Sequence, residues 1–473
     1  HGGAEAEALE HRGRLVAVDQ HHRGGAEQAE AHHAHAHDAA GAKRDARAFE
    51  ASVVTHGRGG YPHVGAHRQP HAQVADRGRE AGAQQKENRP ADLDRQVTRQ
   101  QEQKIQVLVL VALAIAAAGL VWSPARAWGN LLVSGYFLLT LALSGLFFIA
   151  LQYSCGACWS VAFRRIPEAM TYALPAGALV VALVVIFGTP LYEWRHEAHL
   201  AGFKARWLNT PFVLIRAGIF LALWIFVARV IVGRSRGLSP ATGLDDHRRN
   251  VAWSIAFLPL FAISFWLASV DWIMSLEPHW FSTIFGIYNF AGMFEAGLAA
   301  IALLILWLRH SSPLRYAVNE EHLHDLGKLM FAFATFWMYI WFSQYMLIWY
   351  ADITEETVYY LRRQQGYWWP LFVLNVLLNW VVPFFALLPR RTKRTPDLLA
   401  KVAVVMLLGR WLDLYLMVMP AAVPEHPPAG VLEFLLVPAA AAAFVALFAR
   451  GFAQADAVPA ADPLLRASMR YSN

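Results

Sequence analysis

Four ionisable side chains lie deep inside apolar runs of this sequence: Asp271, Glu295, Arg410 and Asp413. Even on a lenient scale, a charged side chain at the centre of a bilayer costs about 2.5–3.5 kcal/mol. Such groups therefore usually face a bundle interior or a water-filled cavity, and they often belong to proton or ion paths. We interpret these four residues as a candidate proton route.

The spacing of these residues allows different roles. Arg410 and Asp413 stand at positions i and i+3, so on a helix they share one face and can pair. The pair could take part in proton transfer, or it could neutralise itself and hold helices together. Glu295 lies about eleven residues, or about 16 Å, into its apolar run and has no opposite charge within one turn. It is interpreted as a proton relay or as an inert interhelical hydrogen-bonding group. Further polar residues could continue the path or act as packing contacts: Tyr339, Ser343, Gln344, Asn375 and Asn379.

A second group of polar residues interrupts the apolar stretch SVDWIMSLEPHWFSTIFGIYNFAGMF at residues 269–294. Glu277, His279 and Trp280 stand at the break between its two apolar runs. Neighbouring breaks are rich in Trp and Tyr, which interfacial aromatic belts explain without any site. Charged residues around 352–363, including Arg362 and Arg363, instead suggest unpaired polar surface for a docking partner.

The elements that must position these side chains are membrane helices. The 473-residue chain is 56% hydrophobic, yet residues 1–104 contain only two aromatic residues and hold twelve of the twenty histidines. That polar segment is predicted to be disordered or a mis-assigned start, with a His-rich metal-binding tail as the alternative. The remainder predicts an all-α integral membrane protein, because its apolar runs reach the roughly 20 residues needed to cross a bilayer. Ten spans are predicted at 105–122, 131–153, 171–190, 212–232, 251–275, 283–308, 329–350, 369–388, 401–419 and 430–450.

Basic residues in the connections predict the orientation of these helices. Nineteen Lys and Arg residues fall on one side and six on the other, so the positive-inside rule places both termini in the cytoplasm. The predicted organisation is a polar segment at 1–104, a ten-helix domain at 105–453 and a cytoplasmic tail at 454–473. The break at Glu277 then faces the outside.

Several chemistries find little support in the sequence. The net charge of +6 is spread along the chain, often at helix ends, which argues against nucleic-acid binding. Cys155 and Cys158 form a CxxC pair without the second ligand pair of a zinc site, so packing at a helix end is favoured over a redox or metal role. No CxxCH, phosphate-loop or iron–sulfur spacing occurs, so we expect no covalently bound haem and no redox centre in this chain.

Two helix ends hint at an internal repeat. DWIMSLEP at 271–278 and DLYLMVMP at 413–420 each begin with Asp and end with Pro, and both helices run outward in the predicted topology. If the second to fifth and sixth to ninth helices form parallel four-helix bundles, Asp271 and Asp413 occupy corresponding positions.

Four stretches together resemble one known family: 158–168, 204–226, 269–294 and the end of the chain at 462–473. They are similar to the second large, NrfD-like membrane subunit of bacterial alternative complex III, a quinol:cytochrome c oxidoreductase. This resemblance covers essentially all of residues 105–473 and implies two four-helix bundles plus flanking helices in the bacterial inner membrane. It also implies partners: a sister membrane subunit, multihaem and monohaem cytochrome c subunits and an iron–sulfur subunit.

The resemblance adds expectations about cofactors and sites. Haem c and iron–sulfur clusters would belong to partner subunits, whereas a quinone or menaquinone could bind this chain. Glu277, His279 and Trp280 fall in the outer motif, where quinol oxidation must release protons, so they are the expected quinone or outer-face residues. The expected function is a non-haem membrane subunit that provides a proton route and contributes to quinone binding. A secondary transporter and a purely architectural anchor are the alternatives.

Overall fold

The computed structural model describes residues 91–196, 201–237, 243–310 and 312–471, with side chains described from Gln103 onward. The polar segment predicted at residues 1–104 lies outside the described residues except for its end. The first described helix, α3, runs from Ala91 to Trp122, so residues 91–104 belong to it. The described residues belong to a unit that begins at Gly82.

Ten helices in the described residues are long and apolar enough to span a membrane, which confirms the predicted number and order. They form a multi-pass, all-α membrane protein. The spans are α3 from Gln103 to Trp122, α4 (Pro124–Ser154), α5–α6 (Arg165–Phe187), α8 (Thr210–Arg236), α9 with its 3-10 end (Gly243–Leu276), α10 (Phe285–Arg309), α12 (Glu320–Ala351), α14–η6–α15 (Trp368–Leu387), α17 (Pro396–Ala422) and α18 (Val431–Phe452).

Several helices extend beyond their predicted limits at the end rich in basic residues. The helix α12 begins at Glu320 although its apolar run was predicted from residue 329. The side chain of Asn319 accepts hydrogen bonds from the backbone of Glu321 and His322, which caps the polar first turns. Elsewhere proline fixes the first turn of a helix, as Pro124, Pro211 and Pro396 do. Local capping, rather than hydrophobicity, sets these boundaries.

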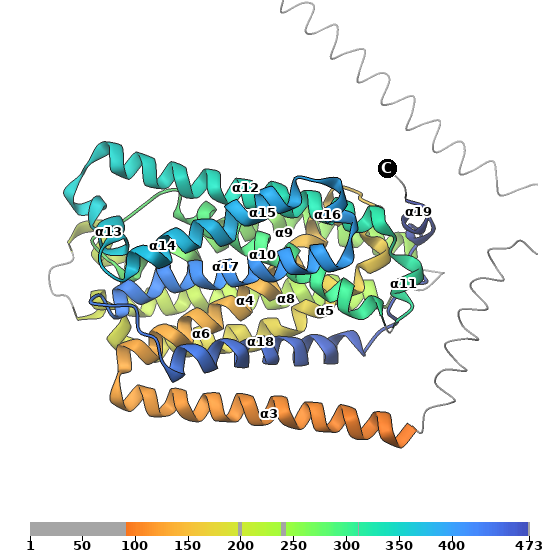
Figure 1. The fold of residues 1–473 in the computed structure, drawn as a ribbon, viewed down its shortest axis with the longest axis horizontal. Helices are drawn as coiled ribbons and strands as arrows, with labels where there is room; N and C mark the ends of the chain where they lie inside the picture. Colours follow the sequence, from red (N-terminus) through yellow and green to blue (C-terminus); the bar gives the residue numbers. More distant parts are fainter. Residues whose placement is uncertain (1–90, 197–200, 238–242, 311, 472–473) are drawn as a thin grey trace, which may run out of the picture. The chain divides into compact units, whose positions relative to one another are not determined.

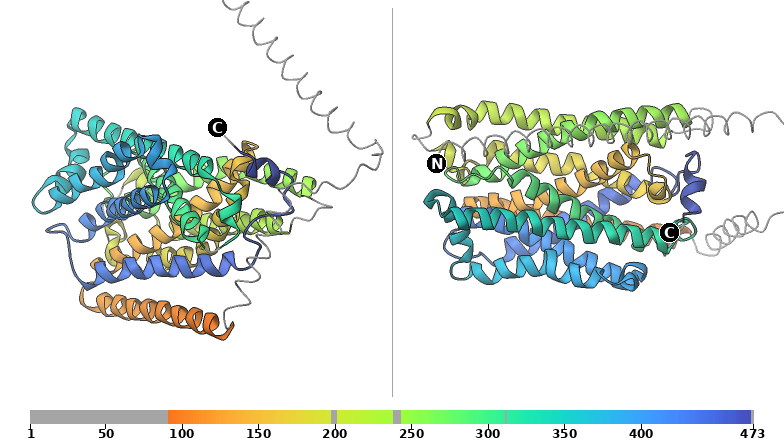
Figure 2. Two further views of the ribbon diagram at one scale, coloured as in Figure 1. Left: turned by 45° about the vertical axis from the view of Figure 1, so that its right-hand side comes forward. Right: turned by 90° about the horizontal axis from the view of Figure 1, so that it is seen from above.

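The ten helices pack as two four-helix bundles plus flanking helices, as the resemblance implied. In the first bundle α4 contacts α6 and α9, and α8 contacts both of these. In the second, α10 contacts α12 and α17, and α15 contacts both of these. The helices α3 and α18 pack against each other beside the first bundle, with α3 at the edge of the array (Figure 1). Figure 2 shows the long helices running side by side in two further views.

Three helices occupy the junction between the bundles. The helix α4 contacts both α10 and α17, and these two also contact each other. Burial follows this arrangement. In the most apolar 18-residue stretch of α4, 94% of the residues are buried, whereas in that of α3 only 17% are buried. Polar side chains on these central helices are therefore shielded from lipid.

Short segments cover the two ends of the bundles. One end carries α7 (Gly202–Trp207) and α13 (Thr354–Gln364). The other carries η1 (Trp159–Phe163), α11 (Leu314–Ala317), α16 (Arg390–Arg394) and α19 (Leu465–Met469).

The segment predicted as a tail at 454–473 packs against the bundle ends as far as it is described. Asp462 forms an ion pair with Arg164. The Ser468 hydroxyl donates to the Trp159 carbonyl over 2.7 Å, and Asn319 donates to the Tyr471 carbonyl over 2.8 Å. The end of the chain thus contacts the connection between α4 and α6 and the connection between α10 and α12.

The packing of α6 on α4 depends on a glycine. A Cβ at Gly177 would lie 2.6 Å from the backbone nitrogen of Leu139 and 2.7 Å from its Cα, and neither atom can move aside. We expect Gly177→Ala to lower the free energy of unfolding by about 1–3 kcal/mol, because overpacking would separate the helices. Thermal unfolding in detergent measures this.

Gly218→Ala is the matched control, because Gly218 lies in α8 with open space around its Cα. This change should be neutral or slightly stabilising, since alanine favours helix. Equal loss of stability in both variants would contradict the packing argument.

Candidate functional site

Asp413 stands at the centre of a buried polar cluster in the second bundle. Its carboxylate accepts a hydrogen bond from the guanidinium of Arg410, with 2.7 Å between Nη1 and Oδ2. Both side chains are almost completely buried. The predicted pairing of these two residues along one helix face is therefore present.

Three other helices of the bundle also donate to Asp413. The Tyr288 hydroxyl on α10 donates to Oδ1, Trp337 Nε1 on α12 lies 3.3 Å from Oδ2, and Asn375 Nδ2 on α14 lies 3.2 Å from Oδ1. An ionised carboxylate prefers such donors when it is removed from water. Asp413 therefore links all four helices of the bundle, and its negative charge is well compensated.

Local backbone features bring the asparagines to this cluster. A π-helical turn at Leu377–Val381 interrupts the eighth span and begins two residues after Asn375. Asn379, within that turn, donates to the side-chain oxygen of Asn375 over 2.8 Å. A Cβ at Gly409 on α17 would lie 2.8 Å from Asn379 Oδ1, so only glycine allows this approach. Such π turns are often found at functional sites.

Arg410 also contacts α10. Its Nη2 donates to the side-chain oxygen of Asn289, and the guanidinium packs against Gly292, where a Cβ would clash with it. The Nε–H of Arg410 has no hydrogen-bond partner among the described residues. One donor of this buried cation is therefore unused among the described residues.

Glu295 lies one helical turn beyond Gly292, on the same side of α10. The residue is 1% exposed, and neither carboxylate oxygen has a hydrogen-bond partner among the described residues. Arg410 and Asp413 act on it electrostatically. Without donors, this carboxyl group can remain buried at low cost only while it holds its proton.

Asp271 belongs to a separate cluster in the first bundle. Arg216 on α8 holds its carboxylate with two hydrogen bonds, Nε to Oδ2 at 2.7 Å and Nη2 to Oδ1 at 2.9 Å. Trp207 Nε1 donates to Oδ1 over 2.9 Å, and the guanidinium lies 4.1 Å from the centre of the Trp207 ring. Asp271 is thus fully paired, and the sequence did not identify Arg216 or Trp207 as its partners.

The two aspartates have related surroundings. Each stands on the last helix of its bundle, and each accepts from one arginine and one tryptophan. Arg216 comes from a neighbouring helix, whereas Arg410 precedes Asp413 on α17 itself. The arrangement of the bundles agrees with the suggested repeat, but the arginines do not correspond in position.

The outer-motif residues form a third, separate group. Glu277 accepts from Arg363 over 2.7 Å and also pairs with Arg362 at 3.5 Å. Arg363 is 2% exposed, so the interpretation of this pair of arginines as unpaired polar surface is wrong. The sequence did not show that Glu277, 86 residues earlier, would neutralise them.

Aromatic packing completes this group. Trp280 is buried and stacks on Tyr359, with ring centroids 3.9 Å apart and an angle of 13° between the planes. Burial raises the pKa of Tyr359 to about 12, so its hydroxyl stays protonated at neutral pH. His279, by contrast, is exposed. Glu277 and Trp280 therefore stabilise the end of the bundle, and His279 faces outward from it.

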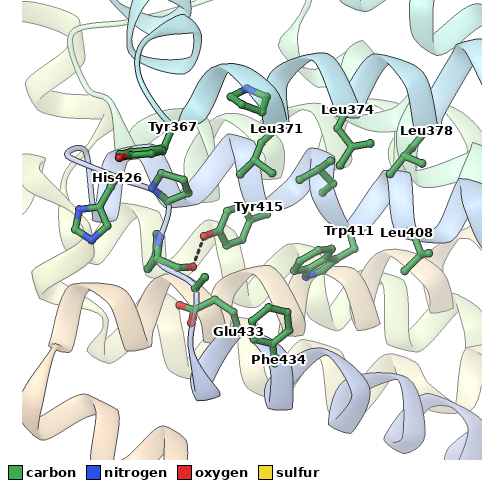
Figure 3. A pocket seen from close by; sticks show the side chains of 15 residues that line it. Tyr367, Leu371, Leu374, Leu378, Leu408, Trp411, Tyr415, His426, Glu433 and Phe434 are labelled. Carbon is green, nitrogen blue, oxygen red and sulfur yellow. Dashed lines mark hydrogen bonds between the residues drawn. The ribbon is translucent and has the colours of Figure 1, made fainter.

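An apolar pocket of about 650 Å³ opens elsewhere, between α14, α17 and α18 (Figure 3). Its wall includes Leu371, Leu374, Leu408 and Trp411, and none of the predicted site residues lines it. Tyr415, His426 and Glu433 supply polar groups toward one end, where the Tyr415 hydroxyl donates to the Pro428 carbonyl over 2.7 Å.

Glu433 is held from behind the pocket. Arg126 donates to it through Nε at 2.8 Å and Nη2 at 2.6 Å, and Asn130 donates over 2.8 Å. The sequence analysis missed this cluster because Arg126 and Glu433 lie near predicted helix ends, where charge is ordinary. The cysteines Cys155 and Cys158 are free thiols near the end of α4 and lie in none of these clusters.

No protein-family model matches the chain, and no curated protein matches it.

The Arg216–Asp271 pair generates a stability prediction. Arg216→Gln leaves a buried carboxylate uncompensated, so we expect a loss of about 3–5 kcal/mol in the free energy of unfolding. Adding Asp271→Asn removes that charge and should recover much of the loss. A double-mutant cycle from unfolding in mild detergent measures the coupling, and additive effects of the two changes would contradict the pairing.

Proposed function

We propose that this protein is the non-haem membrane subunit of a respiratory quinol-oxidising complex, in which Glu295 exchanges protons within the second bundle. The observation that carries the proposal is a buried carboxyl group without any described hydrogen-bond donor, beside a charged cluster. A merely structural acid would be expected to gain donors, as Asp271 and Asp413 have done. Buried ionisable groups of this kind often mark proton relays in membrane proteins.

The Arg410–Asp413 cluster supports the exchange by stabilising the ionised state of Glu295. When Glu295 loses its proton, the positive charge and the unpartnered Nε–H of Arg410 are available to compensate the new negative charge. Asp413 holds Arg410 in place through its own network. Asp271 is assigned a structural role, since Arg216 and Trp207 already satisfy it.

The apolar pocket supports a quinone ligand better than the outer motif does. It has the size and apolar lining typical of sites for small lipophilic molecules. Its polar end could bind a quinone head group, while the leucines of α14 and α17 contact an isoprenoid tail (Figure 3). Haem c, iron–sulfur clusters and the quinol-oxidising chemistry itself would belong to the partner subunits.

Glu295→Gln tests the proton role. The amide keeps the volume of the side chain but cannot exchange a proton, so quinol turnover coupled to proton release should fall at least tenfold in the assembled complex. Glu425→Gln is the control, because Glu425 is an exposed acid in the loop before α18. Turnover and proton release at wild-type levels in Glu295→Gln, with the complex intact, would refute the relay.

Leu374→Trp tests the pocket. The larger side chain would fill the space between α14 and α17 and should weaken binding of a fluorescent quinone analogue at least tenfold. Leu347→Trp, on the exposed face of α12, controls for the addition of tryptophan. Unchanged binding of the quinone analogue by Leu374→Trp would contradict the assignment of this pocket to a quinone. Purification without haem-bearing partners, together with solute exchange by the isolated chain in vesicles, would favour a transporter instead.

A further inference from the structure

A basic hollow of about 400 Å³ lies between the start of α12 and the short helix α16. Glu321, His324, Lys328, Arg390, Lys393 and Arg394 line it. It occurs at the end of the bundles that carries more Lys and Arg, away from the clusters around Asp271 and Asp413. None of its residues takes part in the proposed proton or quinone sites.

The positive charge of this hollow is only partly compensated. Arg394 pairs with Glu321 at 2.6 Å, and Lys328 pairs with Asp325. For Arg390 and Lys393, no ion pair occurs among the described residues. At least two positive charges therefore remain available in one small space.

Lys393 is the most constrained of these cations. The side chain is 7% exposed, and its ammonium group donates to the Leu387 carbonyl over 2.5 Å and to the Leu388 carbonyl over 3.1 Å. Burial lowers the pKa of Lys393, and the nearby charges of Arg390 and Lys328 lower it further. An anion in the hollow would relieve this repulsion, whereas another cation would increase it.

The surroundings indicate what kind of anion fits. Phe385 and Leu388, on the turns that lead into α16, are 65% and 59% exposed. These exposed apolar side chains lie five and two residues before Arg390, at the end of a membrane-spanning helix, and Lys393 donates to the Leu388 carbonyl. A free phosphate would use only the charges, but a phospholipid would use both, with its chains along α15. Basic pockets between membrane helices commonly hold such head groups.

We propose that this hollow binds the phosphodiester head group of an anionic phospholipid. Arg390 and Lys328 contact the phosphate from the open side, and Lys393 supplies buried positive charge beneath it. The acyl chains cover Phe385 and Leu388. The lipid thereby joins the ends of α12 and α15 through contacts that neither helix makes alone.

Lipid binding by the full-length chain tests the proposal. The purified protein in detergent is titrated with fluorescent phosphatidylglycerol, with phosphatidylcholine as the zwitterionic comparison. The double variant Lys328→Gln/Arg390→Gln should bind phosphatidylglycerol about thirtyfold more weakly, since each cation near a membrane surface contributes about a factor of five to six. Both side chains are substantially exposed, and Arg390→Gln alone, expected to weaken binding about fivefold, is the milder variant.

Arg391→Gln is the matched control, because Arg391 belongs to α16 but does not line the hollow. Its affinity for phosphatidylglycerol should equal that of the wild type. Equal affinity for phosphatidylcholine, or equal weakening by Arg391→Gln, would overturn the proposal. Competition by glycerol phosphate as effective as that by phosphatidylglycerol would also overturn it, because the site would then recognise free phosphate without the chains.

Discussion

A carboxylate removed from water must be matched by donors or must keep its proton, and the interior of this protein is arranged around that constraint. Asp413 and Asp271 are matched, each by an arginine and by further donors from neighbouring helices. Glu295 is not matched by any described donor. Three acids at comparable burial thus differ in their surroundings, and the unmatched one is the residue for which we propose proton exchange.

The bundle architecture makes this difference possible. The helices α4, α10 and α17 meet at the junction of the two bundles, so side chains directed there are shielded by protein rather than by lipid. Glycines allow the close approaches: Gly292 accommodates Arg410, and Gly409 accommodates Asn379. The π turn after Asn375 interrupts regular helix at the same depth. A larger side chain at either glycine would therefore displace part of the polar network.

The two ends of the bundles are held by different interactions. At the end predicted to face outward, Glu277 pairs with Arg362 and Arg363 beside the stacked rings of Trp280 and Tyr359. At the opposite end, the last described residues pack back onto the bundles through Asp462 and Ser468. The basic hollow near α16 retains positive charge that the described residues do not neutralise, which is why we assign it to a lipid phosphate.

Periodicity and hydrophobicity were enough to predict the ten membrane helices, because crossing a bilayer demands long apolar runs that are visible locally. The same reasoning identified Asp413, Glu295 and the pairing of Arg410 with Asp413, since residues three apart share a helix face. Local periodicity could not identify Arg216 as the partner of Asp271 or Tyr288 as a partner of Asp413. These pairs are 55 and 125 residues apart in the chain. Nor could it predict the apolar pocket or the basic hollow. Sequence determined which side chains must be buried; only the packing of helices decided which of them would meet a donor, because that depends on contacts between distant segments.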